Sequence, residues 1–240
     1  MSEVDEREND AEIRWGLGDA AIGIVASIVL SAVGVGIVLT VTGDKTADSL
    51  PLWSTALLNI PLWLGLLGAV FYASRRKGRG NLRDDFGFEM RPSDVPIGLV
   101  TGLLLQLATI AVTMPVYRLL GIDTDRVGQT AEDLADRAVS APDVLVLIVM
   151  VVLIAPVIEE LFYRGLVLRS MERKWGTLVA VLGSSLLFAS LHFQWFDLLP
   201  LALAGLAFAL MRVRFGRLGP AIWTHVGFNL IAVISLVAAS

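Results

Sequence analysis

Two adjacent glutamates begin the set of residues in this 240-residue chain that could do chemistry. Glu159 and Glu160 follow an entirely apolar stretch, and Arg164 lies one helical turn further on, on the same face as Glu160. Glu159 points about 100° away from Glu160, so the two carboxylates meet unlike surroundings, as acid–base catalysis requires. A purely structural Glu160–Arg164 ion pair near the membrane surface is the alternative explanation.

The two histidines of the chain, His192 and His225, both fall inside predicted apolar helices. Phe188 precedes His192 by four residues and Asn229 follows His225 by four, so each pair is expected to share a helical face. Imidazole, carboxylate and carboxamide groups activate water and stabilise an oxyanion. One histidine in a membrane helix commonly serves only as a hydrogen-bond partner between helices. Two histidines on separate helices, with a glutamate on a third, favour a catalytic site.

Long stretches without charge indicate that these residues belong to a membrane protein. Hydrophobic residues make up 55% of the chain and charged residues 18%, and the mean hydropathy is +0.72. A spanning helix needs about 20 apolar residues, and a soluble bundle seldom buries helices of that length without a charge. Five runs free of Asp, Glu, Lys and Arg reach this length: 20–43, 49–74, 95–117, 175–196 and 218–240.

We predict an all-α integral membrane protein, a polytopic bundle of about seven to eight transmembrane helices. Backbone groups in lipid must be paired within their own segment, which favours helices. The expected helices cover 16–42, 52–74, 95–120, 143–172, 176–196, 198–214 and 219–239. A short surface helix is expected in the polar connection 121–142. Residues 1–15 are expected to form an acidic cytoplasmic tail, and 16–240 a single membrane domain.

The distribution of basic residues predicts the orientation. If the N-terminus is cytoplasmic, 15 of the 19 Lys and Arg residues fall on the cytoplasmic side. We therefore predict a multi-pass protein of the cell membrane, with the basic connection 75–94 in the cytoplasm. The chain has no cysteine, so disulfides and thiolate chemistry are excluded.

The depths of the two histidines impose a condition on the fold. His192 lies about 24 Å along the fifth predicted helix, whereas His225 lies only six residues into the seventh. The two imidazoles come level only if the fourth and fifth helices project out of the membrane around 169–174. We expect such a projection.

The order EExxxR, FxxxH and HxxxN on successive apolar helices resembles the signature of the CAAX-protease and bacteriocin-processing family, also called Abi. The motifs lie within about 140–235, and the Arg-rich connection ending in DDFGFEM is similar to that of prokaryotic members. The resemblance implies an intramembrane endopeptidase of the type II CAAX prenyl protease kind, with a conical catalytic cavity. Its substrate would be a membrane-associated protein or peptide, whether prenylated or otherwise lipid-anchored, although no residue here identifies a prenyl group.

The same resemblance implies roles for the motif residues. Glu159 would be the general base that activates water, and His192 would help to position that water. His225 and Asn229 would bind the developing oxyanion. Which of the two glutamates is the base stays open. Three further residues would hold the site together: Glu160, Arg164 and Phe188.

A metal ion is the alternative to direct activation of water. The chain lacks the HExxH motif of zinc proteases. Glu159, His192 and His225 could nevertheless supply the three protein ligands of a catalytic zinc site. We favour a metal-free glutamate protease with no cofactor, and zinc remains the alternative.

Two other classes of function compete with the protease. A non-enzymatic membrane scaffold or bacteriocin-immunity protein could share the fold, although the intact Glu159, His192, His225 and Asn229 argue against a degenerate site. A small transporter could use glutamate and histidine as a proton relay, but the repeated, broken helices of that class are not evident. The expected partners are membrane lipids and a membrane-associated protein or peptide, with no nucleic acid. The oligomeric state stays open.

Overall fold

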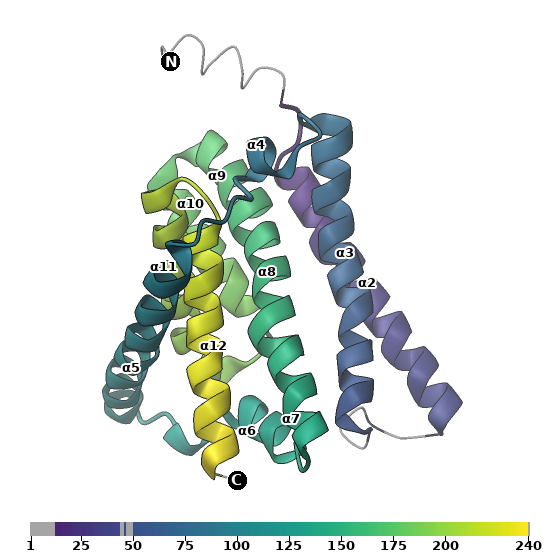
Figure 1. Ribbon diagram of the computed structural model, residues 1–240, viewed down its shortest axis with the longest axis vertical. Coiled ribbons are helices and arrows are strands. Elements are labelled where there is room, and N and C mark those ends of the chain that lie inside the picture. The colour runs from purple at the N-terminus through teal and green to yellow at the C-terminus, as the bar shows by residue number, and fades with distance from the viewer. Residues whose placement is uncertain (1–12, 44–45, 47–49, 240) are drawn as a thin grey trace.

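The computed structural model describes residues 13–43, 46 and 50–239, and within that part of the chain it contains no strand (Figure 1). Six helical stretches are long and apolar enough to cross a membrane, which confirms the predicted all-α membrane fold. The expected acidic tail, 1–15, lies almost wholly outside the described residues.

The chain runs back and forth between the two ends of the bundle. In chain order they are α2 (Leu17–Thr42), α3 (Leu52–Lys77), α4 (Leu82–Phe86), α5 (Asp94–Leu120), η2 (Thr124–Arg126), α6 (Gln129–Asp136), α7 (Ala141–Leu147), η3 (Ile148–Ile154), α8 (Ala155–Glu160), η4 (Leu161–Val167), α9 (Leu168–Trp175), α10 (Thr177–Ser190), η5 (Trp195–Asp197), α11 (Leu198–Phe215) and α12 (Gly219–Ala239). In Figure 1, α4 and the α9–α10 junction lie at one end, and α6 and α7 lie at the other.

Six of the seven predicted apolar helices match the observed ones within three residues at each boundary. The fifth was predicted too long, because α10 ends at Ser190 and has only 14 residues. Six helices of spanning length are therefore observed among the described residues, where about seven to eight were expected. The short helix predicted in the connection 121–142 is present as α6.

The early end of α10 corrects the expectation for His192, which lies in a turn after the helix. The backbone N–H of His192 donates to the Ala189 carbonyl at 3.3 Å. The imidazole Nδ1 instead lies 2.7 Å from the Phe188 carbonyl, which a continuing helix would pair with that backbone N–H. A local side-chain contact of this kind competes with the helical ladder.

The α5–α12 pair packs closely enough that its glycines cannot carry a side chain. A Cβ added to Gly102 would lie 2.4 Å from the Thr224 carbonyl oxygen, and one added to Gly98 would lie 2.3 Å from the Cβ of Trp223. Small residues let helices in a membrane approach to this distance. Because Thr224 directly precedes His225, this contact fixes where α12 holds that histidine.

The connection 78–93 closes the end of the bundle where α3, α9 and α11 end. Asp85 is fully buried and accepts hydrogen bonds from Ser74 Oγ (2.6 Å) and the Arg79 backbone N–H (2.9 Å). The Leu218 backbone N–H donates to the Gly87 carbonyl at 2.8 Å, which joins this connection to the start of α12. The side chain of Phe86 is fully buried.

The two histidines come level, as the predicted projection requires. Figure 1 shows the α9–α10 junction standing further out than the start of α12. The ring of Phe188 lies 4.6 Å from the His192 ring and 5.8 Å from the His225 ring, measured between centroids. His192, just after the end of α10, and His225, near the start of α12, therefore meet around one aromatic side chain.

The close α5–α12 contact gives a test of this packing. We expect Gly102→Ala to lower the melting temperature in detergent, because overpacking costs about 1–3 kcal/mol. Gly68→Ala on α3 is the matched control, since its added Cβ meets nothing within 4 Å. Alanine there should leave stability unchanged or raise it by up to about 1 kcal/mol. Equal melting temperatures for the two variants would contradict the observed packing.

Candidate active site

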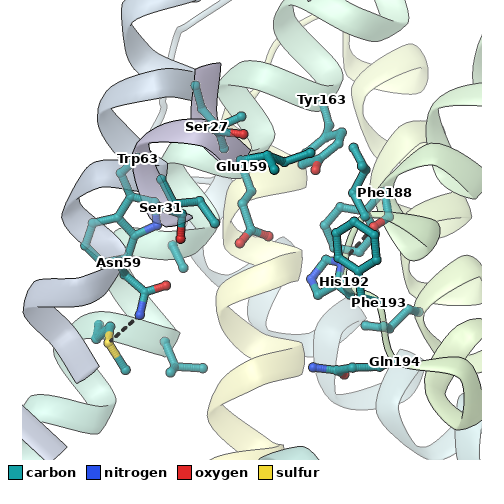
Figure 2. A pocket seen from close by; sticks show the side chains of 18 of the residues that line it. Ser27, Ser31, Asn59, Trp63, Glu159, Tyr163, Phe188, His192, Phe193 and Gln194 are labelled. Carbon is teal, nitrogen blue, oxygen red and sulfur yellow. Dashed lines mark hydrogen bonds between the residues drawn. The ribbon is translucent and has the colours of Figure 1, made fainter. Parts of the chain in front are cut away.

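A cavity of about 950 Å³ lies between the α2–α3 pair and the remaining helices. Glu159, His192, His225 and Asn229 all line it. Figure 2 shows the Glu159 carboxylate pointing into this cavity, with His192 on one side and the α2–α3 residues on the other. The four residues that the motifs singled out as catalytic or oxyanion-binding therefore meet at one place.

The helix that carries both glutamates is interrupted by two π-helical segments. η3 ends just before α8 and η4 begins directly after Glu160, so α8 is a short α-helical piece between two wider ones. π-Helical turns are frequently found at functional sites. The sequence did not predict them, because the apolar residues of 144–158 carry no periodicity that separates α from π geometry.

The two glutamates have different surroundings, as their adjacent positions predicted. The side chain of Glu159 is 17% exposed and faces the cavity, whereas that of Glu160 is fully buried. Glu160 Oε1 accepts a hydrogen bond from Arg164 at 2.9 Å, so the predicted pair is present. Arg164, also fully buried, donates a second hydrogen bond to the Gly205 carbonyl on α11 at 2.9 Å.

Glu160 also fixes the orientation of His225. His225 Nδ1 lies 3.1 Å from Glu160 Oε1, and because an ionised carboxylate can only accept, Nδ1–H donates the hydrogen bond. The other ring nitrogen, Nε2, is 3.9 Å from Glu159 Oε2. That distance is too long for a direct hydrogen bond and short enough for a water molecule to bridge. The ring of Phe208 stacks on the imidazole with centroids 4.3 Å apart.

The His192 ring, like that of His225, is oriented by an acceptor at Nδ1, which here is a backbone carbonyl. Its Nδ1 faces the Phe188 carbonyl, which can only accept, so Nδ1 carries the proton and Nε2 is left with its lone pair. Phe188, predicted as a supporting residue, thus contributes a carbonyl to His192 and a ring that contacts both imidazoles. The guanidinium of Arg164 lies 4.6 Å from the centre of that ring.

Asn229 is engaged by the backbone of the glutamate-bearing helix. Its Nδ2 donates to the Val151 carbonyl at 2.9 Å. In the i to i+5 pattern of η3, that carbonyl would pair with the N–H of residue 156, but Pro156 has none. The Asn229 amide therefore fills an acceptor that the proline leaves open. Its second N–H is not used by this bond.

Several cavity residues were missed by the sequence reasoning. Asn59 and Trp63 of α3 and Ser31 of α2 line the wall opposite the histidines (Figure 2). Asn59 could have been predicted from the sequence as a functional residue, because a carboxamide inside an apolar span is costly unless it has a role. Phe208 and Tyr163 could not have been predicted in this way, since aromatic residues in membrane helices usually serve in packing.

The predicted set of metal ligands is not assembled as a coordination site. Glu159, His192 and His225 line the same cavity. Even so, within the residues that the structure describes, no three His, Cys, Asp or Glu side chains gather closely enough to hold a metal ion. The residues thus fit a zinc ion poorly in this arrangement.

Comparison with known proteins gives two matches. Residues 141–231 match the family described as type II CAAX prenyl endopeptidase Rce1-like. A stretch of 105 residues is 33% identical to an "Uncharacterized 24.3 kDa protein" of Escherichia coli and covers 42% of this chain and 48% of that protein. The match thus spans about half the length of that relative. No solved structure matches the chain. The family match contains all three motifs and confirms the resemblance that they predicted.

The contact between Asn229 and Val151 predicts a specific rescue. Asn229→Ala should lower stability by about 1–3 kcal/mol, because the Val151 carbonyl is left without a donor. Adding Pro156→Ala supplies a backbone N–H for that carbonyl, so the double variant should regain melting temperature. Melting temperatures of the four members of this double-mutant cycle provide the measurement.

Asn59→Ala provides the control for this cycle, because the Asn59 amide donates to the Thr55 carbonyl at 2.9 Å and to Met150 Sδ at 3.7 Å, and neither acceptor depends on Pro156. Pro156→Ala should not rescue that variant. Strictly additive effects of Asn229→Ala and Pro156→Ala would contradict the structural role assigned to Asn229.

Proposed function

We propose that this protein is an intramembrane endopeptidase that hydrolyses a peptide bond of a membrane-associated protein with water activated by Glu159. The family match over residues 141–231 is to a family of proteases, and it supports this class of activity. The observation that carries the proposal is the pairing of a carboxylate that faces the cavity, Glu159, with two imidazoles whose Nδ1 positions are both occupied by acceptors. Such a cavity offers a base and one imidazole to a water molecule, and a second imidazole to the carbonyl oxygen of the substrate.

In the first step, Glu159 takes a proton from water while the water oxygen bonds to the scissile carbonyl carbon. His192 positions that water through Nε2, the nitrogen left free by its contact with Phe188. The carbonyl oxygen gains the negative charge. His225 and the second N–H of Asn229 are proposed to donate hydrogen bonds to it.

In the second step, Glu159 returns its proton to the amide nitrogen and the carbon–nitrogen bond breaks, which releases a carboxylic acid and an amine. The acid then passes its proton to the amine or to water and becomes a carboxylate. For His225 to donate from Nε2, its ring must carry a second proton. The Glu160 carboxylate, 3.1 Å from Nδ1, stabilises the resulting positive charge. Arg164 in turn pairs with the Glu160 carboxylate at 2.9 Å.

The walls of the cavity support a membrane-associated substrate. Opposite the histidines, α2 and α3 contribute apolar side chains, among them Ile24, Ile28, Leu62 and Leu66. These surfaces can cover an apolar chain next to the scissile bond. A prenyl group, another lipid anchor or an apolar peptide segment fits this description equally well.

The assignment of the base predicts different outcomes for the two glutamates. Glu159→Gln should lower turnover about 10²–10⁴-fold, the usual contribution of an acid–base group, with an unchanged melting temperature. Glu160→Gln and Arg164→Ala should lower stability as well. Arg164→Ala leaves a buried carboxylate unpaired, at a cost of about 3–5 kcal/mol.

The measurement begins with membrane proteomes of cells that carry wild-type protein or Glu159→Gln, compared for peptides that only the wild type produces. A cleaved sequence found in this way then serves as the substrate for turnover, alongside melting in detergent. Normal cleavage by Glu159→Gln would exclude it as the base. Normal cleavage by both glutamine variants would favour a non-enzymatic scaffold instead.

Removal of metal ions tests the choice between water activated by protein groups and a zinc enzyme. If Glu159 and His192 activate water directly, protein stripped with a chelator should retain its turnover. The chelated sample, with and without added zinc, is compared with untreated protein in the same assay. Loss of turnover that zinc restores would contradict the metal-free proposal.

A further inference from the structure

One end of the candidate active site is sealed by packed side chains. Beyond Glu160, on the way to α4, lie Phe162, Leu166 and Val167 of η4, and all three are fully buried. Phe86 packs with them, and Gly165 approaches it so closely that an added Cβ would lie 3.0 Å from the Phe86 Cβ. Within the described part of the chain, none of these four side chains lines the cavity, so they separate Glu159 from this end.

The cavity extends toward the opposite end of the bundle. On α3, which begins at that end, its lining residues run from Thr55 to Leu66, and none lies in 67–77. On α10, which ends there, the lining is confined to the last residues and the following turn, where Phe193 and Gln194 lie next to His192 (Figure 2). Leu134 of α6 lines the cavity at the same end.

The sealed end is also the basic end. The connections 75–94, 169–176 and 212–218 meet there, and they carry 12 of the 19 Lys and Arg residues. Basic connections of this length remain in the cytoplasm. The open end, with α6 and the connection 192–197, then faces away from the cytoplasm.

We propose that the active-site cavity is entered from the extracytoplasmic face of the membrane. The occupant is a membrane-anchored peptide or protein whose scissile bond is presented from that face, with its apolar anchor against α2 and α3. The identity of the occupant as a substrate rests on the proposed protease function. The direction of entry rests on the sealed end, the lining residues and the charge distribution.

Single cysteines can test this directly, because the chain contains no cysteine of its own. Ser31→Cys lies in the cavity on α2, and Val33→Cys lies on the same helix, 53% exposed on its outer surface and absent from the cavity lining. Met90→Cys reports on the basic end. A membrane-impermeant maleimide is added to intact cells and, separately, to permeabilised cells.

We expect Ser31→Cys to be labelled in intact cells and Met90→Cys only after permeabilisation. Val33→Cys should be labelled in neither sample, since maleimides need water to react and this position faces lipid. Labelling of Met90→Cys in intact cells would overturn the inference by reversing the orientation. Labelling of Ser31→Cys only after permeabilisation, or not at all, would overturn it by removing the extracytoplasmic opening.

A second measurement links entry to catalysis. Bulky maleimide attached to Gln194→Cys from outside should block cleavage of the substrate identified by proteomics, while the same treatment of Val33→Cys should leave cleavage intact. Unimpaired cleavage by labelled Gln194→Cys would argue that substrates do not pass this mouth. Because labelling of Ser31→Cys does not depend on turnover, failure of the entry route and failure of the proposed protease activity can be told apart.

Discussion

A carboxylate and a guanidinium, Glu160 and Arg164, are buried together in the middle of this helical bundle, and the candidate site depends on their contact. Each charge would be costly alone at this depth, because burial removes it from water. Their pairing leaves one acceptor oxygen shared with His225 and one donor nitrogen for the Gly205 carbonyl. Three separate stretches of chain, η4 with α8, α11 and α12, are thereby tied to a single pair of charges.

The same contact assigns unlike roles to neighbouring residues. Since Glu160 is committed to Arg164 and His225, Glu159 is turned into the cavity, where it retains 17% exposure. The helix that carries them is neither regular nor self-sufficient, because Pro156 follows a π-helical segment and withholds a hydrogen-bond donor. Asn229 of α12 compensates at Val151. A residue that the motif suggests for oxyanion binding therefore also keeps the glutamate helix in place.

The sequence alone predicted the features that follow from the cost of removing charged groups from water. Stretches without charge predicted the apolar helices, and the helical spacing from Glu160 to Arg164 predicted their pairing, because both follow from the cost of burying charge in lipid. The cost of burying charge did not predict where α10 ends. Residues 191–196 are as free of charged residues as the helix before them, and the contact of His192 with the Phe188 carbonyl marks the turn. The π-helical segments were not predicted either, because the apolar residues that form them carry no pattern that separates α from π geometry.

The sequence also did not predict that the N-terminal helices, α2 and α3, line the cavity. Ser31, Asn59 and Trp63 belong to no motif, and their role follows from how the α2–α3 pair stands against the rest of the bundle. Long-range packing of this kind is set by close contacts, such as those at Gly98 and Gly102 between α5 and α12, rather than by hydropathy.

Hydrolysis inside a membrane requires water at the scissile bond without an open path across the bilayer. The asymmetry of this cavity meets both requirements. Toward the basic end, Phe86, Phe162 and Leu166 are fully buried and exclude water from the far side of the Glu160–Arg164 pair. Toward the other end, polar groups of Ser31, Asn59 and Gln194 can hydrate the cavity up to Glu159. The buried ion pair thus stands at the boundary between the dry and the wet parts of the protein, with His225 extending from it toward the side where water is available.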